Sequence, residues 1–188
     1  MLSPLLKKLL FVRQFSIADG KIDILGARHI MLASDALLEL QNIDTTKLYD
    51  LMKDASFKQI SDFVEHAKVY SQLKNVVLLD ISRLSKKLGT GDEGLLRTLQ
   101  EIFDIYGLGN LVITALDNTK KRASVRVYES SIAKAFLEKE KKKSKNAICT
   151  ITAGVLAGIF SYLFKKQVDA VEGKCLAKGN SFCEFLIK

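Results

Sequence analysis

The chain of 188 residues is poor in the residues that mark special protein classes, with three Cys, one Pro and no Trp. Three Cys are too few, and odd in number, for a disulfide framework. One Pro and a hydrophobic content of 48% exclude a low-complexity or disordered chain. The apolar start MLSPLLKKLL is interrupted by Lys7 and Lys8 and lacks a small-residue cleavage site, so it does not fit a signal peptide. We therefore expect a globular protein with reduced thiols in the cytoplasm.

The sequence also lacks a recognisable catalytic motif. The two His residues, His29 and His66, have no Cys or carboxylate partners at ligand spacing. Residues 89–94, GTGDEG, match the G-x-G-x-x-G pattern of a pyrophosphate cradle. We interpret them as a turn between two helices, because Asp92 and Glu93 would repel phosphate at the start of the second helix. We therefore expect no enzyme.

The net charge of +8 is an indicator of acidic partners. Half of it lies in residues 134–145, which hold six Lys and two Glu, so we interpret the charge as local. Such a run can bind nucleic acid or anionic lipid, but it is more often a solvated helix end. No interleaved aromatic or base-reading side chains accompany it. We therefore predict no nucleic-acid partner.

Two pairs of alternating segments predict the sheet. Residues 110–117 and 122–130 flank the turn Asn118–Lys121, and residues 167–177 and 181–187 flank Gly179-Asn180. Strands joined by such short turns run antiparallel. The sequence therefore predicts an α+β fold, with an antiparallel sheet of about four strands packed against several helices.

Apolar residues spaced three and four apart predict these helices. Ser34 is the expected N-cap of the first helix. An N-terminal β-hairpin around Ala18-Asp19-Gly20 is predicted as an extension over residues 1–33, and residues 34–188 as the ligand-binding domain. The expected helices are 34–43, 45–55, 56–71, 73–89 and 91–107, followed by a lysine-rich helix and one within 147–164.

Residues 148–164, ICTITAGVLAGIFSYLF, carry no charge and contain the pattern Gly154-x-x-x-Gly158. They are interpreted either as a membrane span or as a helix buried between a sheet and other helices. We favour burial, because seventeen residues are at the short limit for about 30 Å of hydrocarbon and a β-hairpin follows that needs a folded partner. We expect the small residues at 153, 154, 157 and 158 to pack on the strands.

All three Cys lie near the C-terminal end. Cys149 lies in the first turn of the buried helix if Asn146 is its N-cap, where the helix dipole favours a thiolate.

Glu172 and Cys175 would face opposite sides of a straight strand, but a bulge at Gly173 can turn both to one point. Cys175 and Cys183 lie on either side of the hairpin turn. Together with Cys149 they would form a tetrahedral set for zinc, which accepts thiolate and carboxylate together. The alternative is three buried structural thiols.

Cys149, Glu172, Cys175 and Cys183 stand within the frame C-x-I-T-A-G-x-x-A-G, V-x-x-x-E-x-x-C and G-x-x-x-C-x-F. Over residues 147–187 this frame resembles the 4-vinyl reductase domain, a small-molecule-binding module also found in aromatic-sensing transcription activators. The resemblance extends more weakly back to about residue 35. It implies a fold shared with Golgi-transport TRAPP subunits, a homodimer, a zinc site of these four residues and a pocket for apolar ligands.

Other properties of the family are not expected here. The sequence shows no ATPase or DNA-binding region and no site for a hydride source. The activators hold their aromatic effectors partly through Trp, which this chain lacks. We therefore expect a non-catalytic, zinc-containing protein that binds a hydrophobic small molecule, hydrocarbon or lipid-like, as sensor or carrier. The alternative is an enzyme or accessory factor in tetrapyrrole vinyl reduction.

Overall fold

The computed structural model describes residues 15–18, 20–24, 27–29, 31–73, 100, 103–104 and 106–188. Its elements, in chain order, are β1 (Phe15–Ala18), β2 (Lys21–Ile24), β3 (Ala27–His29), α2 (Ser34–Ile43), α3 (Thr45–Leu73), β4 (Asn110–Asp117), β5 (Arg122–Tyr128), α6 (Ser131–Glu140), α7 (Thr150–Phe164), β6 (Ala170–Lys174), the 3-10 helix η1 (Leu176–Lys178) and β7 (Cys183–Ile187).

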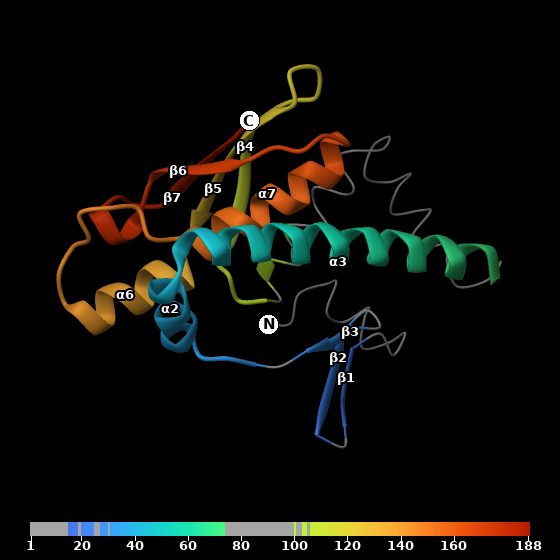
Figure 1. Ribbon diagram of the computed structural model, residues 1–188, viewed down its shortest axis with the longest axis horizontal. Coiled ribbons are helices and arrows are strands. Elements are labelled where there is room, and N and C mark those ends of the chain that lie inside the picture. The colour runs from blue at the N-terminus through green and yellow to red at the C-terminus, as the bar shows by residue number, and fades with distance from the viewer. Residues whose placement is uncertain are drawn as a thin grey trace.

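A four-stranded antiparallel sheet in the order β4-β5-β7-β6 forms one layer. The α7 helix packs on this sheet, and α3 crosses α7 on the side away from the strands (Figure 1). Alternate residues of the central strands are buried against α7: Val125, Val127, Phe185 and Ile187. The predicted α+β fold with its antiparallel sheet is therefore confirmed.

The long helix α3 replaces two predicted helices. It runs without interruption from Thr45 to Leu73 and contains neither Gly nor Pro. Ser56, the expected start of a separate helix, instead donates its hydroxyl to the carbonyl of Met52 at 2.6 Å, a bond made within a continuous helix. The α2 helix begins at Ser34, although Ala33 occupies the N-cap position expected for Ser34. The predicted helices over 73–89 and 91–107, and the turn at 89–94, lie mostly outside the described residues.

The strands β1, β2 and β3 form a separate antiparallel sheet below α3 in the view of Figure 1. The extension over residues 1–33, and its boundary with the domain 34–188, stay predictions.

Helix α7 is buried on nearly all sides, as expected for the apolar stretch 148–164. It has 15 residues. Within the described part of the chain, no helix combines the length and apolar character that a membrane crossing requires.

The two glycines of α7 face helix α3, not the strands as predicted. A Cβ on Gly154 would lie 2.6 Å from the carbonyl oxygen of Tyr49. A Cβ on Gly158 would overlap the carbonyl oxygen of Lys53 and the hydroxyl of Ser56. The close approach also lets the Ser56 hydroxyl reach the carbonyl oxygen of Val155, at 3.2 Å. The sequence shows the small residues but not which neighbour uses them.

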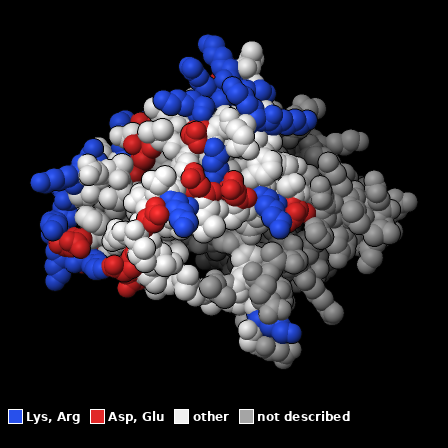
Figure 2. All heavy atoms as spheres, viewed as in Figure 1, with Lys and Arg blue, Asp and Glu red and all other residues white. Residues whose placement is uncertain are grey.

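Basic residues gather in two places, so the expectation that the charge is local to residues 134–145 was incomplete. Figure 2 shows Lys and Arg on the left, where α6 lies in Figure 1, and a second group at the top, where the β4–β5 turn lies. The exposed residues Lys120 and Arg122 belong to that turn. The second group could not be read from the sequence as a single run, because separate segments contribute to it.

Candidate metal centre

Cys149 lies at the start of α7 and occupies its N-cap position. The helix therefore begins later than predicted, since Asn146 was the expected N-cap. The Cys149 sulfur lies 3.6 Å from the Cys183 sulfur and 3.9 Å from the Cys175 sulfur. Ser130 adds a buried hydroxyl 3.5 Å from the Cys149 sulfur, a neighbour that the sequence did not reveal.

The β6–β7 hairpin supplies the other sulfurs. The pairing of β6 with β7 shifts register between Glu172 and Lys174, which confirms the bulge predicted at Gly173. Cys175 follows β6, and its backbone N–H donates to the side-chain oxygen of Asn180 at 3.2 Å. The next backbone N–H, that of Leu176, donates to the Cys183 sulfur at 3.3 Å. These bonds fix the turn that places both thiols on the same side.

Glu172 completes the group from β6. Its Oε2 accepts a hydrogen bond from the backbone N–H of Cys149 at 2.8 Å. Its Oε1 is buried and has no hydrogen-bond partner among the described residues. A buried carboxylate oxygen without a partner is destabilising, so a ligand for it is expected at this place.

The ligand atoms of Cys149, Glu172, Cys175 and Cys183 all lie within 4.8 Å of one another, so the four residues can hold a metal ion. Two sulfurs bound to zinc at about 2.3 Å in a tetrahedron lie about 3.8 Å apart. The observed sulfur separations of 3.6 and 3.9 Å match this geometry. The structure thus brings together every residue predicted for the site.

The protons of this group are unevenly held before a metal binds. Hydrogen bonds to the Cys175 and Cys183 side chains raise the pKa of Cys149 well above its ordinary value. Hydrogen bonds from Cys149 and Cys183 lower the pKa of Cys175 to about 2. The pKa of Cys183 rises to about 12, because the hydrogen bond from Cys149 that lowers it is outweighed by the bond to Cys175 and by burial. Burial, followed by the charge of Cys175, raises the pKa of Glu172 to about 7.

Metal binding at this group is expected to depend steeply on pH. At neutral pH, Cys149 and Cys183 carry protons and Glu172 is about half protonated, so a bound ion displaces about two to three protons. The affinity for zinc therefore falls as the pH falls, by about 100- to 1000-fold for each pH unit near neutrality. Calorimetric titration in buffers of different ionisation enthalpy measures the proton count. An affinity that does not change between about pH 6 and 8 would contradict the assignment.

A groove of about 910 Å³ lies between α2 and α6. It is lined mainly by charged and small residues: Ser34, Asp35, Ala36, Glu39, Ser131, Lys134, Ala135, Glu138 and Lys139. Such a lining does not suit the apolar ligand that the sequence predicts.

Comparison with known proteins identifies the C-terminal part of the chain. Residues 125–188 match the vinyl-4-reductase domain. The matched range includes α7, the β6–β7 hairpin and all four residues of the cluster. The chain therefore contains a domain of the vinyl-4-reductase family, as the resemblance noted in its sequence predicts.

The similarity to individual proteins extends over different lengths. An uncharacterized protein of Methanocaldococcus jannaschii is 44% identical over 41 residues, which are 22% of this chain and 24% of that protein. The alignment thus spans about a quarter of that relative.

Among solved structures, the phenol-responsive sensory domain of the transcription activator PoxR, solved with phenol, has a TM-score of 0.68. It is 18% identical and aligns over 99% of this chain and 90% of that chain. A vinyl-4-reductase family protein of Methanocaldococcus jannaschii has a TM-score of 0.48 at 17% identity, over 86% of this chain and 83% of that chain. The PoxR comparison establishes a shared fold.

Proposed function

We propose that this chain is a non-catalytic protein that binds a small hydrophobic molecule and holds one zinc ion in the group Cys149, Glu172, Cys175 and Cys183. The observation that carries the metal part is the convergence of three sulfur atoms on a buried carboxylate oxygen that has no other described partner. Thiolate ligands favour zinc over magnesium or calcium, which prefer oxygen.

The metal would have a structural role. Four protein ligands fill a tetrahedral zinc site and leave no position for a substrate or an activated water. The ligands come from the start of α7 and from the β6–β7 hairpin, so the ion would tie the helix to the edge of the sheet. Zinc supplies the positive charge that allows the buried thiolates and carboxylate to lie side by side.

The proposed ligand is a hydrocarbon or lipid-like molecule. The support is the vinyl-4-reductase domain and the fold shared with a sensory domain that was solved with phenol. Binding would be driven by burial of apolar ligand surface, at about 25 cal/mol for each Å². A sensor or carrier of this kind would change its shape or its pairing when the ligand enters. We further propose that the protein acts as a homodimer in the cytoplasm.

Native mass spectrometry of freshly purified protein tests these proposals together. We expect the mass of a dimer, one zinc ion for each chain and an apolar adduct that organic solvent extracts. A bound pigment with visible absorbance would instead favour the tetrapyrrole enzyme. A mass free of both metal and adduct would contradict the proposed function, and a metal-bound protein without an adduct would contradict only the ligand.

A further inference from the structure

Gln41 of α2 contacts the chain on both sides of Cys149. Its side-chain nitrogen donates to the carbonyl oxygen of Ile148, and its side-chain oxygen accepts from the backbone N–H of Ile151 at 3.2 Å. Gln41 is only 4% exposed, although α2 is largely an exposed helix. A buried amide that makes both of these bonds fixes the backbone between them.

These contacts replace a cap that α7 does not provide for itself. The first N–H groups of a helix have no partner within the helix, and an N-cap side chain normally accepts from one of them. Cys149 holds the N-cap position of α7 but makes no side-chain cap bond. Gln41 supplies the acceptor from another helix, which leaves the Cys149 sulfur free to point toward Cys175 and Cys183.

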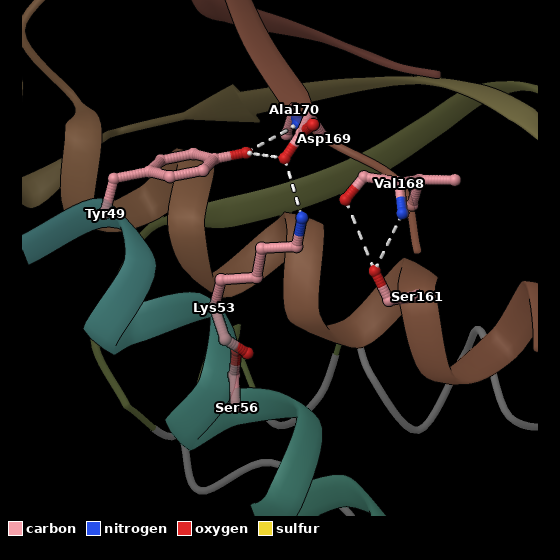
Figure 3. Close-up of polar contacts among 7 residues, drawn as sticks. All are labelled: Tyr49, Lys53, Ser56, Ser161, Val168, Asp169 and Ala170. Atoms are coloured by element: carbon pink, nitrogen blue, oxygen red, sulfur yellow. Dashed lines mark hydrogen bonds and ion pairs between the residues drawn. The ribbon is translucent and has the colours of Figure 1, made fainter. Parts of the chain in front are cut away.

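A second contact holds the strand that carries Glu172. The hydroxyl of Tyr49 donates to Asp169 at 3.1 Å and accepts from the backbone N–H of Ala170 at 3.0 Å (Figure 3). The Nζ of Lys53 lies 2.7 Å from the same Asp169 carboxylate oxygen (Figure 3). Ala170 begins β6, two residues before Glu172.

The charges of this second contact are stable near neutral pH. Burial raises the pKa of Tyr49 to about 12, so the hydroxyl keeps its proton. The hydrogen bond from Lys53 lowers the pKa of Asp169, so the carboxylate stays ionised. Helices α2 and α3 therefore hold both of the segments that carry Cys149 and Glu172.

We propose that Gln41 and Tyr49 are positioning residues for the metal centre, through which helices α2 and α3 and the bound ion stabilise one another. This rests on the proposed zinc site. Both residues lie outside the matched range 125–188, so the segment that matches the family would not hold its ion alone. Coupling of this kind is reciprocal: disturbing the helices weakens metal binding, and removing the metal loosens the helices.

Titration of the metal-free full chain with Co²⁺, followed by its thiolate-to-metal absorbance, tests the first direction. Loss of an outer contact of a metal site typically weakens binding about 10- to 100-fold. We expect that loss for Gln41→Met, which keeps the side-chain length but removes both hydrogen bonds, together with a weaker thiolate band. Tyr49→Phe should weaken binding in the same direction.

Ile60→Ala is the control for a loss of stability alone. Ile60 is a buried residue of α3 that makes neither contact, so its removal should leave the Co²⁺ affinity within about twofold. Gln41→Met with wild-type affinity and a full thiolate band would overturn the inference and leave the metal site standing. A wild-type chain that binds no Co²⁺ would overturn the proposed site and the inference with it.

Hydrogen exchange on the unmodified chain tests the opposite direction and needs no variant to fold. Removing the metal with a chelator should speed amide exchange in α2 and in the first turns of α3, in addition to residues near Cys149. Unchanged exchange in those helices, in a protein shown to have lost its metal, would overturn the coupling.

Discussion

Replacing Cys183 with Ser is expected to unfold the C-terminal third of the molecule at temperatures where the wild-type chain is stable. Cys183 is fully buried in β7, which lies between β5 and β6 in the sheet. Structural zinc sites contribute about 10–16 kcal/mol of apparent binding free energy to folding. Losing even about 5 kcal/mol of this lowers the midpoint of thermal unfolding by about 10–20 °C in a chain of this size. Circular dichroism, with the metal content measured on the same samples, gives the result.

Chelation of the wild-type protein is the matched control, since it removes the ion without changing a side chain. The chelated wild type should unfold near the temperature of the Cys183→Ser variant, and the chelator should not shift the variant further. If both proteins unfold at the wild-type temperature, the three thiols are ordinary buried side chains and the metal does not stabilise the fold.

The second large effect is expected at the crossing of α3 and α7. Gly158→Ala places a methyl group against the backbone of Lys53, and the nearest atom of Phe57, its backbone nitrogen, lies at 2.9 Å. Overpacking in a core is destabilising by about 1–3 kcal/mol and sometimes more. Because neither neighbour is the flexible end of a side chain, we expect about 3 kcal/mol, measured by urea unfolding.

Gly173→Ala is the control for this prediction. A Cβ on Gly173 would meet a single atom, the carbonyl oxygen of Glu184, at an ordinary 3.8 Å. This change should alter the free energy of unfolding by less than about 1 kcal/mol. The sign at Gly158 separates the alternatives, because Ala is favoured over Gly by about 1 kcal/mol in a helix that does not pack closely. A stabilised Gly158→Ala variant would contradict the observed crossing.

The sheet could be predicted from the sequence because its information is local. Alternating apolar residues and the turn at Gly179-Asn180 set the direction and the pairing of β6 and β7, whatever the rest of the chain does. The helices were harder. Nothing local shows that Ser56 lies inside a helix and does not begin one, because a serine can serve both positions. The partner of Gly154 and Gly158 depends on how separate elements pack, which spacing alone does not contain.

The candidate site divides in the same way. Cys149, Glu172, Cys175 and Cys183 could be chosen because the residue types are rare and closely spaced in the sequence. Gln41 could not, because it contacts Ile148 from 107 positions away and belongs to no motif. Tyr49 reaches Asp169 across 120 positions. The sequence thus supplied the residues that would bind the ion and missed those that hold them in place.

X-ray absorption at the zinc edge of the purified protein tests the central claim most directly. The account predicts one zinc ion for each chain, surrounded by three sulfur atoms at about 2.3 Å and one oxygen at about 2.0–2.2 Å. A zinc ion with fewer than three sulfur neighbours, or a protein that carries no zinc after purification without chelator, would contradict it.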